Sequence, residues 1–171
     1  MPRELVEREG ELGRLDELLV RARADTGVVV FVLGEPGVGK TRLVEEAGRR
    51  GSEIGMDVLR ARGGELEQQL PFGVVRQLFE ARLSGETPAS REELFEGAAE
   101  LARPVFDLPE TERTTAGEDP PFAVLHGLYW LAANLAARTP VALLIDDAHW
   151  ADRASRRWLD YLARRIEALG I

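Results

Sequence analysis

The chain has 171 residues, of which 44% are hydrophobic and 30% charged, which is typical of one globular domain with a buried core. The formal net charge of −8 argues against a broad nucleic-acid surface, and the absence of cysteine excludes disulfides and thiolate metal sites. The charged N-terminus lacks a signal-peptide core and no apolar run is long enough to cross a bilayer, so we expect a cytoplasmic protein with no membrane partner.

The first third of the chain alternates between helix and strand patterns. Apolar residues recur at helical spacing over residues 11–24, which predicts a first helix. The β-branched run at 28–33 predicts a strand buried on both faces of a parallel sheet. After a glycine-rich loop, a helix is predicted over 40–51 and a second strand over 56–61.

The middle of the chain is predominantly helical by pattern. Helices are predicted over 71–83, with Pro71 in the first turn, and over 91–105. Residues 107–121 are polar and contain several prolines and threonines, so they are predicted to form a loop.

The last third returns to alternating elements. Residues 122–137 are apolar nearly all round, which predicts a buried helix with Trp130 in the core. A third strand is predicted over 141–145 and a last helix over 153–169, with Asp152 as its N-cap. Strands that alternate with helices predict an α/β fold built on a parallel sheet.

The segment GEPGVGKT, from Gly34 to Thr41, matches the phosphate-binding pattern G-x-x-x-x-G-K-[ST] between a predicted strand and a predicted helix. Lys40 is the only lysine of the chain, and its slim ammonium stem reaches β- and γ-phosphates where a planar guanidinium would not fit. We assign Lys40 a catalytic as well as a binding role, and the Thr41 hydroxyl a role as Mg²⁺ ligand. The alternative is a glycine-rich turn that binds nothing. The predicted ATP contacts here are Gly34, Glu35, Pro36, Gly37, Val38, Gly39, Lys40, Thr41 and Arg42.

Two carboxylates, Asp146 and Asp147, follow the apolar strand predicted at 141–145. We expect Asp146 to hold Mg²⁺, through water, and Asp147 to act as the base for the attacking water. The alternative is a buried strand that ends in an acidic turn. A guanine-reading [NT]-K-x-D motif would require a second lysine, so ATP is a better expectation than GTP.

With both motifs present, the chain resembles STAND-class ATPases of the AAA-related P-loop branch and, more narrowly, the N-terminal ATPase module of large LuxR-type transcriptional regulators. The resemblance implies a P-loop NTPase fold with three α/β/α layers and an incomplete RecA/AAA-like core. It rests on LVEREGEL (5–12), VVVFVLGEPGVGKTRL (28–43), LPFGVVRQLF (70–79), LHGLYWLAANLA (125–136) and LLIDDAHWADRASRRWLDYLARR (143–165).

The resemblance also implies a domain map and a further strand. Residues 1–171 would be the N-terminal part of one ATPase domain, and a strand after the final helix would insert between the strands at 28–33 and 141–145. We therefore expect the chain to be a fragment that ends before this strand. The expected parts are an N-terminal segment and helix (1–27), a P-loop βαβ unit (28–64), a helical insertion (65–139) and the Walker B strand and helix (140–171).

The family pattern V-G-R-E-x-E-L, which packs beside the adenine, is matched here at Val6 and Arg8, while Glu7 replaces its glycine. The resemblance thus implies that Val6 and Arg8 contact ATP. The alternative is the start of a helix with exposed charges.

Three functions remain open from the sequence. The first is an ATP-dependent switch of a transcriptional regulator, which would bind DNA only through a domain absent from this chain. The second is a constitutive ATPase motor or loader, which needs an arginine finger in trans; Arg156–Arg157 and Arg164–Arg165 are candidates, although a solvated face explains them as well. The third is a scaffold that binds nucleotide without hydrolysis. Nucleotide-dependent self-association is also left open.

Overall fold

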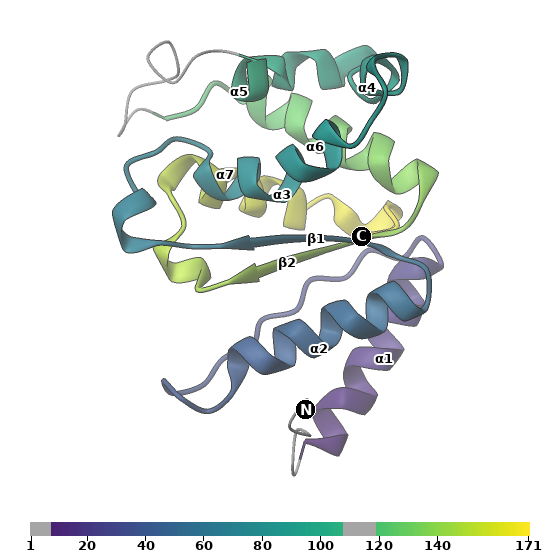
Figure 1. Cartoon of the computed structure of the whole chain (residues 1–171), viewed down its shortest axis with the longest axis vertical. Coiled ribbons are helices and arrows are strands. Elements are labelled where there is room, and N and C mark those ends of the chain that lie inside the picture. The colour runs from purple at the N-terminus through teal and green to yellow at the C-terminus, as the bar shows by residue number, and fades with distance from the viewer. Residues whose placement is uncertain (1–7, 108–118) are drawn as a thin grey trace.

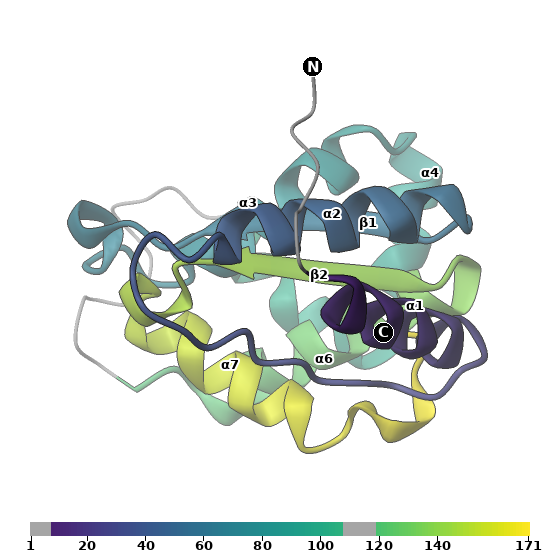
Figure 2. The ribbon, with the colours of Figure 1, turned by 90° about the horizontal axis from the view of Figure 1, so that it is seen from below.

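The structure, a computed structural model, describes residues 8–107 and 119–171 and is built around a short parallel sheet (Figure 1). Strands β1 (Asp57–Arg62) and β2 (Val141–Asp146) pair in parallel, with Asp57 opposite Val141 and Arg62 opposite Asp146. Helices form a layer on each side of this sheet, and on one side further helices lie outside that layer (Figures 1 and 2). The α/β class predicted from the alternation of strands and helices is therefore confirmed.

The helices divide between the two layers. Helix α2 (Lys40–Glu53) packs on one face of the sheet with α1 (Glu9–Arg23) beside it. The opposite layer contains α3 (Gly73–Ser84), α4 (Pro88–Leu94), α5 (Arg103–Asp107), α6 (Phe122–Arg138) and α7 (Arg153–Ala163), with the short 3₁₀ segments η1 (Glu65–Glu67), η2 (Gly97–Ala102), η4 (Ala148–Trp150) and η5 (Ile166–Ala168) in the connections.

The largest hydrophobic core lies between the sheet and the layer of α3, α6 and α7. Phe79, Leu128 and Trp158 are fully buried, and the rings of Phe79 and Trp158 meet edge to face at 5.6 Å. The prediction of a buried helix at 122–137 is confirmed for most of α6. It is wrong for two of its aromatic residues, because Phe122 and Trp130 remain 65% and 42% exposed.

Two predicted helices have different ends in the structure. The single helix predicted over 91–105 is divided into α4, η2 and α5, because Gly97 adopts a left-handed φ of 64° and interrupts the helical path. Thr87 caps α4 by accepting a hydrogen bond from the Ser90 backbone. Helix α7 ends at Ala163, earlier than predicted, and the chain continues through the turn at η5. Most of the loop predicted at 107–121 lies outside the described residues.

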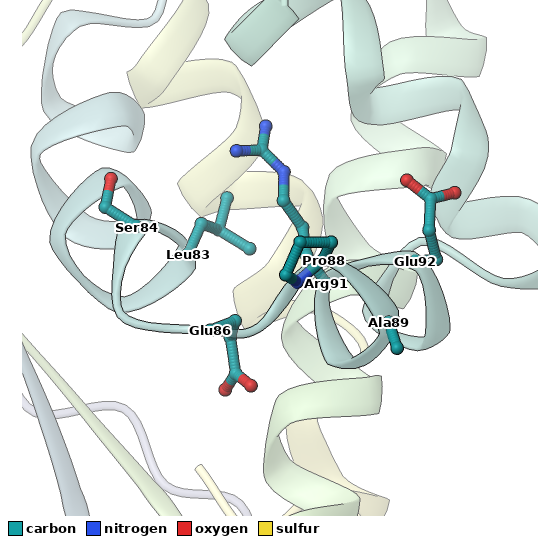
Figure 3. A pocket seen from close by; sticks show the side chains of 7 residues that line it. All are labelled: Leu83, Ser84, Glu86, Pro88, Ala89, Arg91 and Glu92. Atoms are coloured by element: carbon teal, nitrogen blue, oxygen red, sulfur yellow. The ribbon is translucent and has the colours of Figure 1, made fainter.

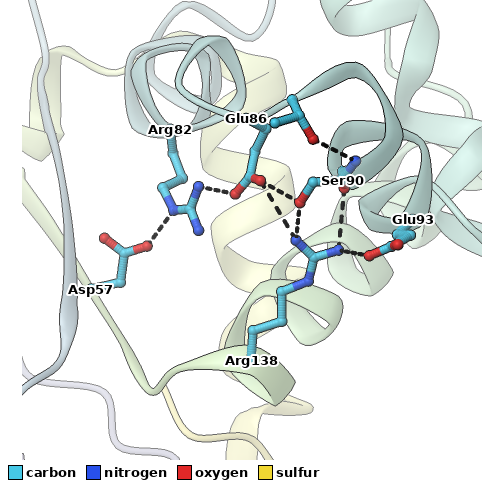
Figure 4. Close-up of polar contacts among 7 residues, drawn as sticks. Asp57, Arg82, Glu86, Ser90, Glu93 and Arg138 are labelled. Carbon is cyan, nitrogen blue, oxygen red and sulfur yellow. Dashed lines mark hydrogen bonds and ion pairs between the residues drawn. The ribbon is translucent and has the colours of Figure 1, made fainter.

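A polar network ties β1 to the helical layer (Figure 4). Arg82 of α3 donates to Asp57 at the start of β1 over 2.6 Å and also contacts Glu86. Arg138 at the end of α6 donates to Ser90 of α4 over 2.7 Å and to Glu93 over 2.9 Å. These charge-assisted bonds hold α3, α4 and α6 in register at the edge opposite the phosphate-binding loop.

The prediction of a buried strand at 28–33 is wrong for this chain. The segment is extended but forms no strand, and Phe31 and Leu33 are 80% and 87% exposed. Its first residue, Val28, donates to the Ile171 carbonyl over 2.9 Å, and Val141 donates to the Gly170 carbonyl over 2.7 Å. Residues 170–171 thus separate the start of the segment from β2, and no strand of the described residues pairs with the segment beyond this point. Without a ladder partner it is not a strand, and most of its side chains stay exposed.

Gly127 of α6 marks a close helix–backbone contact. A methyl group at this position would lie 2.5 Å from the Ala102 nitrogen and 2.7 Å from the Leu101 carbonyl carbon. We expect Gly127→Ala to lower the free energy of unfolding by about 1–3 kcal/mol, because backbone on both sides must move apart. Urea denaturation measures the change.

Gly13 of α1 supplies the matched control for this substitution. No atom lies within 4 Å of a methyl group added there. Gly13→Ala should therefore raise stability by about 0.5–1 kcal/mol through helix propensity alone. If Gly127→Ala behaved in the same way, the close packing of α6 on η2 would be refuted.

Candidate nucleotide-binding site

The glycine-rich loop connects the extended segment at 28–33 to α2. Gly37 and Gly39 have φ angles of 83° and 88°, a region that residues with a Cβ atom rarely adopt. Gly39 is also the N-cap of α2, so the turn leads directly into the N-terminus of that helix. Because the first N–H groups of a helix have no intrahelical acceptor, a turn that leads into a helix N-terminus offers the backbone donors that phosphate binding uses.

Lys40 lies inside this loop. Its Nζ atom donates to the carbonyl oxygens of Gly34 and Glu35, each over 2.8 Å. Carbonyl oxygens solvate an ammonium group less favourably than phosphate oxygens do, because phosphate carries a full charge. The loop thus holds the ammonium group of Lys40 beside the N-terminus of α2, and its binding of phosphate remains a prediction.

Thr41 and Asp146 meet although 105 positions separate them. The Thr41 hydroxyl donates to Asp146 Oδ2 over 2.9 Å, which joins the first turn of α2 to the end of β2. A hydroxyl and a carboxylate are the hard oxygen ligands that Mg²⁺ accepts. No group of three His, Cys, Asp or Glu side chains that could hold a metal occurs in residues 8–107 and 119–171. A magnesium ion here would therefore need phosphate and water oxygens to complete its coordination, as expected for an ion bound together with a nucleotide.

Asp147 occupies the sharp turn after β2. Its backbone is left-handed, with φ 49° and ψ 40°, and its N–H donates to Asp146 Oδ1 over 3.0 Å. Its side chain accepts two hydrogen bonds from Arg62, over 3.0 Å from Nε and 2.8 Å from Nη2. The hydrogen bond to Asp147, followed by the charges of Asp147 and Asp146, raises the pKa of Arg62. The carboxylate predicted to activate water is therefore held by a guanidinium in this structure.

Arg62 was not found from the sequence. It is the last residue of β1, directly opposite Asp146 in the parallel register. A signal was available, because neighbouring parallel strands end at the same edge of a sheet. A basic residue directly after the strand predicted at 56–61 would therefore lie near the carboxylates that follow the strand predicted at 141–145.

The predicted adenine-side contacts are described only in part. Arg8 lies immediately before α1, and its guanidinium contacts the Val38 carbonyl of the phosphate-binding loop. Val6 lies outside the described residues. Pro36 belongs to the same loop, and Arg42 to the first turn of α2. The structure thus brings Arg8, the loop at 34–41 and the two carboxylates after β2 to one edge of the sheet, and their contacts with ATP remain predictions.

Asp152 fixes the loop that follows the two carboxylates. This buried side chain accepts hydrogen bonds from the backbone of Phe72 (2.9 Å), Val74 (3.3 Å) and Ser155 (2.9 Å). The prediction that Asp152 caps the last helix is confirmed, and the same residue also satisfies the N-terminus of α3. Pro71 consequently stands before α3 rather than in its first turn, since the left-handed Phe72 lies between them.

The arginines considered as interprotomer fingers differ in their partners. Arg157 pairs with Asp119, which Arg153 also contacts, and Arg164 pairs with Asp160 one turn earlier. These side chains are about half exposed or more, so the solvated face considered as the alternative describes their position.

Two other features lie away from the loop. A pocket of about 440 Å³ opens between α3 and α4, lined mainly by short and charged side chains (Figure 3). His126 of α6 bonds to the Tyr161 hydroxyl and accepts a hydrogen bond from the Trp130 indole, and these contacts account for both of its ring nitrogens.

Helix α2, which carries Lys40 and Thr41, is also held by an ion-pair cluster on its outer face. Arg49 and Arg50 both donate to Glu46, and Arg50 also contacts Asp16 of α1. Hydrogen bonding to Arg49, supported by Arg50, lowers the pKa of Glu46 from 4.5 to about 2. Glu46 therefore holds both arginines on α2 while it is ionised, and the pair of Arg50 with Asp16 joins the cluster to α1.

This lowered pKa gives a pH-dependent prediction. A carboxylate with a depressed folded-state pKa contributes its full stabilisation above the unfolded value of 4.5 and loses it as the pH falls toward about 2. We expect Glu46→Gln to lower the melting temperature at pH 6, and we expect this effect to shrink as the pH falls below 4.5 and to vanish below about 2. If the difference in melting temperature between Glu46→Gln and the unmodified chain stayed constant from pH 6 to pH 2, the charge of Glu46 would not contribute to stability.

Comparison with known proteins agrees with this geometry. Residues 4–170 match the family described as AAA ATPase domain. Uncharacterized protein R02095 of Rhizobium meliloti (strain 1021) is 30% identical over 185 residues, an alignment that covers 95% of this chain and 17% of that protein. The chain thus spans about a sixth of this relative's length. No solved structure matches.

The described residues contain no helix with the length and apolar character needed to cross a membrane.

The family match covers nearly the whole chain and includes both the phosphate-binding loop and the carboxylates after β2. The chain therefore belongs to the AAA ATPase domain family.

Proposed function

We propose that the chain binds ATP and hydrolyses it slowly, as the nucleotide switch of a transcriptional regulator whose DNA-binding domain lies outside this chain. The observation that carries the proposal is the meeting of Thr41 with Asp146 beside a loop that contains Lys40. An α/β fold that places a phosphate-binding loop against a carboxylate from the neighbouring sheet edge is suited to a metal-bound nucleoside triphosphate.

Each residue of the site has a separate role in this proposal. Lys40 leaves the carbonyls of Gly34 and Glu35 and binds the β- and γ-phosphates, while backbone N–H groups at the start of α2 bind the same oxygens. Thr41 and Asp146 would hold Mg²⁺, which neutralises charge that develops on the phosphates. Asp147 accepts a proton from the attacking water. Arg8, whose guanidinium contacts the Val38 carbonyl of the loop, contributes a further contact to ATP.

The regulatory part of the proposal rests on two supports. The first is the resemblance to LuxR-type regulators in the segments at 70–79 and 143–165. The second is that the Rhizobium meliloti relative is about six times longer than the aligned region, so a module of this kind occurs within a larger protein. In such a protein, an ATPase domain would bias the arrangement of its neighbours through its bound nucleotide.

Two other functions make different demands on the chain. A motor or loader requires fast turnover and an arginine finger from a second protomer, and nucleotide-dependent self-association would accompany it. A scaffold requires nucleotide binding without hydrolysis.

Binding and turnover measured on the same protein separate these functions. We expect binding of a fluorescent ATP analogue in the presence of Mg²⁺ and phosphate release well below the usual enzyme median of about 10 s⁻¹. Turnover at or above that median would favour the motor, and binding with no phosphate release would favour the scaffold. No binding would overturn the proposal.

A further inference from the structure

We propose that the aromatic face of α6 and the arginines at the start of α7 form a docking groove for an acidic peptide segment of a partner protein, which also carries an apolar anchor side chain. Asp119 of this chain occupies part of the groove and competes with that peptide. Binding at this groove requires no nucleotide, so it is separate from the proposed ATPase function.

One wall of the docking groove is a row of aromatic side chains on α6. Phe122, His126 and Trp130 stand four residues apart, so they share one face of the helix. The ring of Phe122 stacks on that of His126, with centres 5.9 Å apart, and meets Tyr161 of α7 edge to face at 5.6 Å. Phe122 and Trp130 are nevertheless 65% and 42% exposed. An exposed row of aromatic side chains is typical of a surface that contacts another molecule.

The other wall is basic. A cavity of about 370 Å³ opens between the start of α6 and α7. Its apolar lining is Phe122, Leu125 and Tyr161, and its charged lining is Arg153, Arg156, Arg157 and Asp160. The carboxylate of Asp160 is paired with Arg164. The cavity thus carries an excess of positive charge in a chain whose net charge is −8, and it favours a ligand that is both anionic and apolar.

The chain itself shows that these arginines bind a carboxylate. Asp119 Oδ1 lies 2.7 Å from Arg153 Nη2 and Oδ2 lies 2.5 Å from Arg157 Nη1, so one carboxylate bridges two guanidinium groups. The hydrogen bond from Arg157, together with the charge of Arg153, lowers the pKa of Asp119. Arg156 is exposed and has no ion-pair partner among residues 8–107 and 119–171. It is therefore available for a second carboxylate.

Asp119 is a competitor that a partner can displace. Its side chain is 52% exposed, and those of Arg153 and Arg157 are 58% and 47% exposed. Exposed ion pairs contribute little to stability, because water solvates both charges well. A peptide that also places an apolar side chain in the cavity removes apolar surface from water, which Asp119 does not.

The charge of the whole chain favours a short acidic peptide over a nucleic acid or an anionic membrane. With a net charge of −8, the chain repels a polyanion that extends beyond the docking groove, whereas a peptide places its few charges beside the arginines. The cavity is near the lower end of the range of about 300–1,000 Å³ that is usual for ligand sites, which fits an anchoring side chain.

The test uses a fluorescein-labelled peptide of four Asp-Asp-Leu repeats, added to nucleotide-free protein at physiological ionic strength. Fluorescence anisotropy measures its Kd. We expect Arg156→Ala and Phe122→Ser each to weaken binding by about threefold to tenfold, because they remove an ionic and an apolar contact. Arg14→Ala, which removes an exposed arginine from α1, should leave the Kd unchanged. Failure of the peptide to bind, or equal weakening by Arg156→Ala and Arg14→Ala, would overturn the proposal.

Asp119 supplies a second readout, because its removal should improve binding. We expect Asp119→Asn to tighten binding of the peptide by about twofold to fivefold, the range by which an exposed ion pair can compete. Glu17→Gln removes the same charge from an exposed position on α1 and should leave the Kd unchanged. If both variants changed the Kd equally, Asp119 would not compete for the docking groove and the proposal would be wrong.

Other ligands establish the class of partner. Repeats of Asn-Asn-Leu and of Asp-Asp-Ser should bind at least about tenfold more weakly than Asp-Asp-Leu, since each lacks one of the two contacts. Tighter binding of oligothymidylate or of phosphatidylserine vesicles would contradict a peptide partner. Lys40→Ala should bind the peptide as the unmodified chain does. A failure of ATP binding would thus refute only the proposed function, and a failure of peptide binding only the docking groove.

Discussion

Lys40→Ala is expected to weaken ATP binding about 100-fold or more, because charge-assisted hydrogen bonds to phosphate each contribute about 1.5–3 kcal/mol and a tenfold change in Kd corresponds to 1.4 kcal/mol. The loop should keep its shape, since Gly37 and Gly39 set its backbone. Lys40→Arg is expected to lose most of the affinity as well, because the broad guanidinium does not fit beneath the loop. Titration calorimetry or a fluorescent ATP analogue measures both changes.

Arg164→Ala is the matched control for this experiment. It removes the same unit of charge from an exposed site just after α7, where Arg164 pairs only with Asp160 in the described residues. The Arg164→Ala variant should bind ATP with the affinity of the unmodified chain. Circular dichroism should show the same fold for all variants. ATP affinity within about threefold of the unmodified chain for Lys40→Ala would contradict the proposed site, because that change is under 1 kcal/mol.

Asp152→Ala is expected to have the largest effect on stability, a loss of about 3–5 kcal/mol. Three buried backbone N–H groups, those of Phe72, Val74 and Ser155, would lose their acceptor, and each unsatisfied group costs about 1–3 kcal/mol. Two helices would lose their N-terminal cap in the same substitution. Urea denaturation followed by circular dichroism measures the free energy of unfolding.

Asp160→Ala on the same helix tests whether this loss is specific. Its carboxylate is 64% exposed and pairs with Arg164, so its removal should change stability by less than about 0.5 kcal/mol. Asp152→Asn, which keeps one acceptor oxygen, should lie between the two. If Asp152→Ala and Asp160→Ala lowered the free energy of unfolding equally, the hydrogen bonds from Asp152 to the first turns of α3 and α7 would not contribute to stability.

The elements that could be predicted from sequence are those with a local cause. Helix α2 and strand β2 lie where periodicity placed them, within one or two residues. The cap at Asp152 was predicted from residue type and position alone. The helix predicted over 91–105 is divided because Gly97 adopts a left-handed conformation. This cause is also local, but the apolar pattern of the segment gave no sign of it.

The sequence by itself determined the phosphate-binding loop, the single lysine within it and the carboxylates that end β2, because each depends on residue types a few positions apart. Only the tertiary structure decided that Arg62 binds Asp147, 85 positions away, and that Asp152 also satisfies α3. It also decided that residues 28–33 form no strand despite a strand pattern. The physical reason is that side-chain type sets local backbone preference, whereas pairing and burial depend on which neighbour the folded chain brings alongside.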